Sequence, residues 1–131
     1  MKNYWLIWLL LLPFWQVKAQ DEAQKDSIYT IVEFMPQPEE GYKKFYQYLQ
    51  ENLYYTQEAL EKKIQGYVFV QFIVNSEGKL ENIKVIKGLG YGLDEEAIRV
   101  FAESPPWRAG WHKGKKVPVR MTFHIAFRLP P

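Results

Sequence analysis

The clearest pattern in the chain is a regular alternation of apolar and polar residues near its C-terminus. The apolar residues occupy every second position, at Val117, Val119, Met121, Phe123, Ile125, Phe127 and Leu129. The positions between them are mostly polar, namely Pro118, Arg120, Thr122, His124, Ala126 and Arg128. Because strand side chains alternate between two faces, this pattern predicts a strand over residues 117–129 with one buried face. A proline near its start cannot donate a ladder hydrogen bond, which favours an edge strand.

A second strand-like segment spans residues 66–75 (GYVFVQFIVN), in which nearly every position is apolar or aromatic. Such a run predicts a central strand that is covered on both faces. A turn sequence follows at residues 75–78 (NSEG), and residues 79–87 (KLENIKVIK) return to a strand pattern. We therefore expect these two segments to form a hairpin.

Helices are expected where apolar residues recur at helical spacing. The first begins at the acidic residues 39–40 and runs to about residue 52, and a short second helix covers residues 57–63. A third covers residues 94–103, with Asp94 as its N-cap. A short β-branched and aromatic segment at residues 28–32 predicts a first strand. Together these elements predict a small α+β module.

The first nineteen residues have the pattern of a secretory signal peptide. Lys2 supplies a positive charge, residues 4–15 (YWLIWLLLLPFW) contain no charged residue, and small residues occupy positions 17 and 19. Cleavage is expected after Ala19, which leaves residues 20–28 as a short polar leader. The apolar run has twelve residues, whereas a membrane-spanning helix needs about 20. The alternative is an uncleaved inner-membrane anchor through residues 4–17.

Composition and charge narrow the range of functions. A chain of 131 residues fits one domain with a short appendage. It has 17 basic and 15 acidic residues, and loss of residues 1–19 removes two lysines and no acid, so the mature chain is neutral. That balance argues against a nucleic-acid partner, which requires a basic surplus. Residues 105–131 hold six basic residues and no acid, which indicates either a solvated face or a surface that steers an acidic partner.

Catalytic chemistry has little support in the sequence. The absence of cysteine excludes a disulfide framework, a thiolate zinc site, a cysteine nucleophile and a cysteine-linked lipid anchor. The two histidines, His112 and His124, lack metal-binding spacing, and no serine lies in a G-x-S-x-G elbow. The glycine-rich residues 88–92 lack the lysine of a phosphate-binding loop. We therefore expect no enzyme activity, no cofactor and no metal.

The long terminal strand points to a different function. An unpaired strand edge can bind an extended peptide, because main-chain hydrogen bonds supply affinity while alternate side chains set the register. The alternative is that the strand pairs within the sheet and that its edge is covered. The sequence thus predicts a protein-binding module in preference to an enzyme.

A set of short segments occurs in the order found in a known family. The segments are EFMP (33–36), YL (48–49), NLYY (52–55), IQGYVFVQFIV (64–74), GKL (78–80), VIKG (85–88), LDEEA (93–97), WRAG (107–110) and the terminal strand. Together they resemble the TonB C-terminal domain, in the version found in energy transducers of Bacteroidetes-type bacteria. The resemblance covers residues 29–129, which is nearly all of the mature chain.

This resemblance implies a two-layer α+β fold over residues 29–131, with a small antiparallel sheet, a β-β-α-β core, two helices and a long C-terminal edge strand. It also implies a periplasmic protein linked to transmembrane transport, whose last strand pairs with the TonB box of outer-membrane TonB-dependent receptors. An inner-membrane proton-driven motor is a further partner in that family. The receptor-binding residues implied by the resemblance are Val119, Arg120, Met121, Thr122, Phe123, His124, Ile125, Ala126 and Phe127.

The chain departs from the family pattern at three places. Residues 38–41 (PEEG) replace a proline-glycine-glycine stretch, Thr56 follows Tyr55 where a proline is usual, and Lys63 replaces a glycine. About nine residues separate Ala19 from the first expected strand, and at ~3.5 Å each they span roughly 30 Å. A tether of this length is too short for an inner-membrane protein to reach the outer membrane. We therefore expect a module that binds receptor segments without itself carrying force. The alternative is an assembly module that dimerises through its last strand, with no receptor or transport role.

Overall fold

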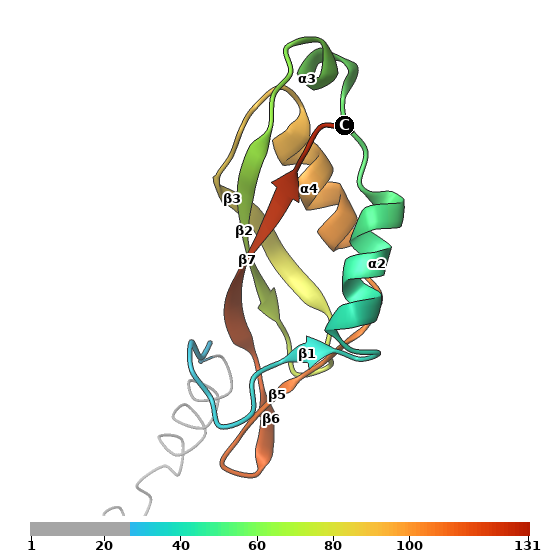
Figure 1. Ribbon diagram of the computed structural model, residues 1–131. Helices are drawn as coiled ribbons and strands as arrows, with labels where there is room; N and C mark the ends of the chain where they lie inside the picture. The colour runs from blue at the N-terminus through green and yellow to red at the C-terminus, as the bar shows by residue number, and fades with distance from the viewer. Residues whose placement is uncertain (1–26) are drawn as a thin grey trace, which may run out of the picture.

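A computed structural model describes residues 27–131, drawn as a ribbon in Figure 1. The expected signal peptide and most of the expected leader lie outside the described residues. Among those described, no helix has the length and apolar character needed to cross a membrane. The elements in chain order are β1 (Gln37–Pro38), α2 (Tyr42–Asn52), α3 (Gln57–Glu61), β2 (Gly66–Val74), β3 (Leu80–Lys87), α4 (Leu93–Ala102), β4 (Trp107–Arg108), β5 (Gly110–His112), β6 (Lys115–Val117) and β7 (Val119–Phe127).

The central sheet has the strand order β3-β2-β7, and both pairings are antiparallel. β2 pairs with β7 without interruption, from Gly66 opposite Phe127 to Val74 opposite Val119. β2 and β3 form the predicted hairpin, in which the Asn75 side chain accepts hydrogen bonds from two amides of the turn. β7 therefore lies at one edge of the sheet, as the alternating pattern predicted.

Helices α2 and α4 cover one face of this sheet (Figure 1). The core between the two layers is aromatic at its centre, where the ring centroid of Phe72 lies 5.1 Å from that of Phe101 and 5.5 Å from that of Trp107. Phe45 of α2 joins this cluster, 5.2 Å from Trp107. Burial of apolar surface between the layers is the main contribution to stability in a domain of this kind. The two-layer α+β fold expected from the sequence is confirmed, and the short helix expected at residues 57–63 forms as α3, which ends at Glu61.

The prediction that β2 is covered on both faces is wrong for most of its length. Tyr67 is 46% exposed, and Phe69 and Gln71 are half-buried, because none of the helices within residues 27–131 covers the second face of the sheet. The aromatic side chains on this face cover one another instead, since His124 lies 5.4 Å from the Tyr67 ring and 5.9 Å from the Phe69 ring. Only near its end is the strand buried on this side, at Ile73.

The predicted strand over residues 117–129 is divided by Pro118 into β6 and β7. Val117 ends β6 and pairs with Gly110, whereas Val119 begins β7 and pairs with Val74 of the central sheet. Proline has no N–H and a nearly fixed φ, so the strand changes partner at this residue. The alternation continues through the break because the side chains of Val117 and Val119 are both buried, beside Val32.

Residues 110–117 form the β5–β6 hairpin, which lies between β4 and β7 in the chain. Its turn residues Lys113 and Gly114 have φ values of 52° and 77°. Two consecutive positive φ values are typical of the tight turns that join antiparallel strands. The hairpin extends from one end of the molecule, and the C-terminus lies at the opposite end (Figure 1).

The first expected strand, at residues 28–32, is reduced to a single backbone bridge. Tyr29 donates its N–H to the Pro118 carbonyl at 3.0 Å and accepts the Arg120 N–H at 2.8 Å, which places it parallel to the start of β7. A second bridge joins Phe34 to Trp111, before the two-residue strand β1. This segment is held to the fold at separate points, with Val32 buried between them.

The helices form where the sequence placed them, with different first turns. α2 begins only after Gly41, so the acidic residues 39–40 precede the helix. α4 has Gly92 as its N-cap, and Asp94 lies inside the first turn. The Asp94 carboxylate instead accepts the amides of Leu89 and Gly90, at 2.9 and 3.1 Å, and so fixes the glycine-rich loop before the helix. Asp94 therefore binds the loop and does not cap the helix, because the loop lies within hydrogen-bonding distance of its carboxylate.

Candidate functional site

The outer edge of β7 carries unpaired backbone groups. The Arg120 N–H bonds to Tyr29, so the backbone of Arg120 points away from β2. In an extended strand the N–H and C=O of one residue point to the same side and alternate along the chain. Thr122, His124 and Ala126 therefore also direct both groups outward, and within residues 27–131 these groups have no hydrogen-bond partner. Unpaired donors and acceptors in a row are a template for an added strand.

The opposite edge of the sheet, β3, is less suited to accept a strand. Its pairing with β2 contains two register shifts, and Asn82 has a left-handed backbone with φ of 51°. Irregular backbone and exposed lysines such as Lys84 and Lys87 are devices that protect sheet edges from pairing. By contrast, β7 is regular over nine residues. The two edges thus differ, and the accessible one is β7.

A hollow of about 680 Å³ runs along this edge, between β7 and α2. α2 runs beside β7 in Figure 1. The helix contributes Tyr46, Leu49, Gln50 and Leu53, which lie on one helical face because they are three or four residues apart. The remaining lining comes from Tyr55, Tyr67 and residues 122–128. We call this hollow, together with the outer edge of β7, the edge groove.

The floor of the edge groove is fixed by aromatic packing. Phe123 of β7 is half-buried, and its ring lies 5.6 Å from both Phe45 and Phe101. Tyr46 packs on the same ring from α2 at 5.9 Å but remains half exposed. The groove therefore offers an aromatic surface whose position is set by buried neighbours.

Helix α2, the second wall of the groove, is tied to α4 by a half-buried phenol. The Tyr48 hydroxyl donates to the Val100 carbonyl at 2.7 Å. Desolvation by burial is the main reason that the pKa of Tyr48 is raised, with nearby carboxylates adding to it. The phenol therefore stays protonated and keeps donating at neutral pH. This bond holds α2 in place against the second helix.

A polar network fixes the chain that follows α2. The Arg99 guanidinium donates to the Glu96 carboxylate and to the Asn52 carbonyl, and Glu96 also accepts the Tyr54 amide at 3.0 Å. The hydrogen bond from Arg99 is the main reason that the pKa of Glu96 is lowered, and the same pair raises the pKa of Arg99. Tyr55, which lines the groove, comes next in the chain and is thereby positioned.

The nine residues proposed from sequence form one continuous strand, but they differ in position. The side chains facing the helices are Val119, Met121, Phe123, Ile125 and Phe127, which are buried or half-buried. The four exposed side chains are Arg120, Thr122, His124 and Ala126. The structure adds groove residues that sequence reasoning did not assign to a site, among them Tyr46, Tyr55 and Tyr67. The signal for Tyr46 was its position beside the apolar stripe of the first helix, whereas no local pattern marked Tyr55 or Tyr67.

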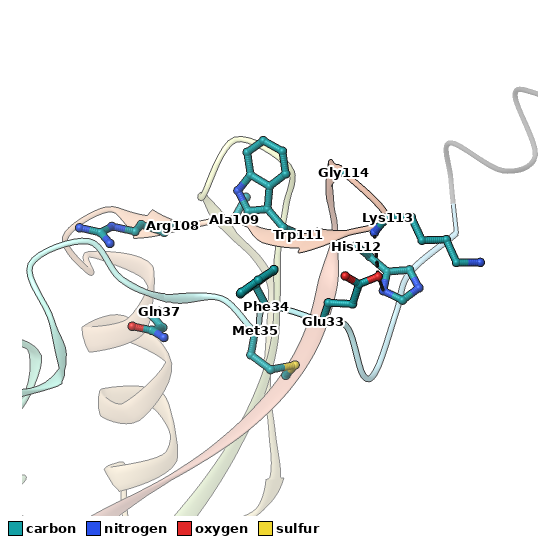
Figure 2. Close-up of a pocket in the computed structure, with 10 residues that line it drawn as sticks. All are labelled: Glu33, Phe34, Met35, Gln37, Arg108, Ala109, Trp111, His112, Lys113 and Gly114. Atoms are coloured by element: carbon teal, nitrogen blue, oxygen red, sulfur yellow. Dashed lines mark hydrogen bonds and ion pairs between the residues drawn. The ribbon is translucent and has the colours of Figure 1, made fainter.

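A second, smaller hollow of about 380 Å³ lies at the β5–β6 hairpin (Figure 2). Here the Glu33 carboxylate lies 3.9 Å from His112 Nδ1 and accepts the Lys113 amide at 3.3 Å. Among the described residues, no three histidine or acidic side chains are grouped so that they could hold a metal. His124 lies on β7 against Tyr67 and Phe69, and His112 lies on β5, so each histidine has separate neighbours.

Comparisons with known proteins agree with this architecture. The solution structure of the Helicobacter pylori TonB C-terminal domain (residues 179–285) is similar, with a TM-score of 0.53 and 22% identity, over 69% of this chain and 81% of that one. The Pseudomonas aeruginosa TonB C-terminal domain gives a TM-score of 0.47 and 23% identity, over 60% and 79%. No curated protein matches. The family described as the Gram-negative bacterial TonB protein C-terminal matches residues 51–129, and this chain therefore belongs to the TonB C-terminal domain family.

Proposed function

We propose that this protein binds extended segments of outer-membrane TonB-dependent receptors by strand addition to β7. The observation that carries the proposal is the row of unpaired backbone groups on Thr122, His124 and Ala126, beside the hollow between β7 and α2. The family is known generally as the receptor-interacting part of TonB energy transduction, and its domains are not catalytic. The TonB box is the segment of the receptor that would add to the sheet.

The side chains of an added strand would contact the two sides of the edge groove alternately. One set of its side chains would point into the hollow beside Tyr46, Leu49 and Leu53. The other set would lie over the uncovered sheet face, near Tyr67 and His124. Each main-chain hydrogen bond contributes only about 1 kcal/mol in water, so apolar contacts in the hollow are needed for useful affinity. We therefore expect apolar or β-branched residues at alternate positions of the receptor segment.

The location that fits this function is the periplasm. Residues 1–19 supply the export signal, and in the alternative residues 4–17 remain as an inner-membrane anchor. TonB family proteins are generally periplasmic or membrane-anchored. Both arrangements leave the edge groove on the side where receptor segments are available. An inner-membrane proton-driven motor would be a partner only in the anchored form.

The test uses two substitutions at one position. Thr122→Pro removes an outward N–H but no hydrogen bond to β2, whereas Thr122→Val keeps the N–H and a similar shape. TonB-box peptides from the same organism are titrated by calorimetry, with thermal unfolding as the check of folding. We expect Thr122→Pro to weaken binding about tenfold or more, and Thr122→Val to change it by less than about threefold. Equal binding by all three proteins, or none at millimolar peptide, would contradict the proposal.

A second candidate function is assembly through the same edge. The unpaired groups of β7 can pair with β7 of another copy as readily as with a receptor segment. That function would need no receptor. A dimer formed in this way would occupy the edge proposed for receptor segments.

A further inference from the structure

The hairpin end of the molecule exposes large apolar side chains close to lysines. Ile31 is 82% exposed, Phe34 is 68% exposed and Trp111 is 42% exposed. Lys113, Lys115 and Lys116 lie in or beside the same hairpin and are also exposed. We call these six residues the hairpin tip. It lies apart from the edge groove, since the two hollows share no lining residue.

Backbone pairing holds the aromatic residues of the tip together. Phe34 and Trp111 exchange two hydrogen bonds, of 3.1 and 2.9 Å, so their side chains lie on the same face of the small ribbon. Trp111 pairs in turn with Lys116, whose Nζ lies 5.8 Å from the centroid of the indole ring. Phe34, Trp111 and Lys116 therefore form a row across three neighbouring segments. Figure 2 shows the indole of Trp111 projecting away from the hairpin.

The charge of the tip is positive. Residues 105–131 contain no acid, and Glu33 is the acidic residue that lines the hollow at this end. Its carboxylate is already engaged, since it accepts the Lys113 amide and lies beside His112. The ammonium groups of the three lysines thus have no acidic partner among the salt bridges of residues 27–131.

The preceding part of the chain joins the fold at this same end. Tyr29 is bonded to Pro118 and Arg120 at the start of β7, and its ring lies 5.4 Å from that of His112. The apolar run at residues 4–15 ends fourteen residues before Tyr29, a span of roughly 50 Å at most. When that run lies in a membrane, this length keeps the hairpin end of the molecule within reach of the surface.

We infer that the hairpin tip docks on an anionic phospholipid surface. Tryptophan and phenylalanine are suited to the headgroup level of a bilayer, and lysines next to them are attracted by anionic phosphates. The positive charge attracts the tip to such a surface, and in the anchored form the chain also joins the fold at this end. The edge groove stays free, because β7 runs away from the tip towards the opposite end of the molecule (Figure 1). Docking would therefore orient the groove towards the periplasmic space.

The test uses the full chain reconstituted into vesicles, with one fluorophore. Because the chain has no cysteine, Gly114→Cys gives a single labelling site in the hairpin turn, and Gln57→Cys gives one on α3 at the opposite end. A polarity-sensitive label at position 114 should shift to the blue in vesicles that contain phosphatidylglycerol. It should shift much less in pure phosphatidylcholine, and the label at position 57 should not shift in either.

Two matched triple variants distinguish an effect of the lysines at the hairpin tip from an effect of the net charge of the protein. Lys113→Gln, Lys115→Gln and Lys116→Gln together should abolish most of the shift, since each lysine near an anionic surface strengthens docking about fivefold. Lys62→Gln, Lys63→Gln and Lys87→Gln remove the same charge elsewhere and should leave it. Equal responses at positions 114 and 57, or equal responses in both lipids, would overturn the inference. Loss of the shift in both triple variants would also overturn it, because the effect would then follow net charge and not the tip.

Discussion

Single residues determine where the exposed edge strand β7 begins and how the turns of the fold close. Pro118 ends one ribbon and starts the strand of the central sheet, and its carbonyl still accepts the Tyr29 amide. Because its missing N–H faces outward, the proline removes no hydrogen bond between β7 and β2. Gly78 has a comparable role, since its φ is 83° and a Cβ there would lie 2.0 Å from the Trp107 carbonyl oxygen. Such positions are fixed by backbone geometry and not by side-chain chemistry.

At the residue scale we predict that Glu96→Gln reduces the acid sensitivity of the fold. The lowered pKa of Glu96 means that its network contributes stability above the ordinary value of 4.5, and that this is lost as the pH falls through the folded-state pKa. The variant should lose about 1 to 3 kcal/mol at neutral pH and show a shallower decline in acid. Urea unfolding measured at a series of pH values checks this. An unchanged slope below the ordinary glutamate pKa would show that the network does not form.

At the element scale, the edge of β7 is shared between an internal and an external partner. Tyr29 occupies the first outward position, at Arg120, and leaves the next three outward residues open. The segment around Tyr29 is therefore a fixed end for any strand added to β7. A receptor segment bound to β7 could not extend past Tyr29 towards the β5–β6 hairpin, which limits its register.

This arrangement predicts a defined pattern of amide hydrogen exchange along β7. In the wild-type protein the Arg120 and Phe123 amides should exchange slowly and the Thr122 amide fast, because only the last lacks an acceptor. Tyr29→Pro removes the N–H that anchors the segment, and should speed exchange at Arg120 while Phe123 stays protected. A bound receptor peptide should slow exchange at Thr122, His124 and Ala126. Equal protection of Arg120 in the wild type and in Tyr29→Pro would contradict the bridge.

At the scale of the whole molecule, the fold is a two-layer domain whose two proposed binding surfaces lie at different places. The edge groove lies along its flank, and the hairpin tip lies at the end where the chain enters. The uncovered sheet face carries the aromatic side chains of Tyr67 and Phe69 beside His124. Because the two surfaces are separate, contact at the hairpin tip would leave the edge of β7 free to bind a peptide.

The association state tests whether self-association and receptor binding use the same edge. Pairing between copies and binding of a receptor segment both need the outward groups of Thr122, His124 and Ala126, so we expect them to exclude each other. Sedimentation velocity with increasing TonB-box peptide should show any dimer fraction fall as the edge is occupied. Thr122→Pro should reduce both interactions. A dimer that persists at saturating peptide would place self-association on another surface.

The sequence by itself determined the longer elements, which are α2, α3, α4, β2, β3 and β7, and the edge character of the last strand. Strict alternation at residues 119–127 requires one buried face, and helical spacing in α2 and α4 requires an apolar side, whatever the tertiary partners. The alternation located the strand, and the family resemblance implied that residues 119–127 of it form the receptor-binding edge. Their division into four exposed and five inward side chains also follows from the alternation.

Only the tertiary structure decided which edge groups are open and what lies beside them. Tyr29 reaches Arg120 across more than ninety positions of sequence, and no local pattern encodes that bridge. Tyr46 and Tyr55 become groove residues because α2 packs along β7, which is a property of the packed layers. The aromatic run of β2 suggested burial on both faces, but the fold has one helical layer. Periodicity is a local property of the chain, whereas pairing, coverage and the position of a hollow depend on segments that are distant in sequence.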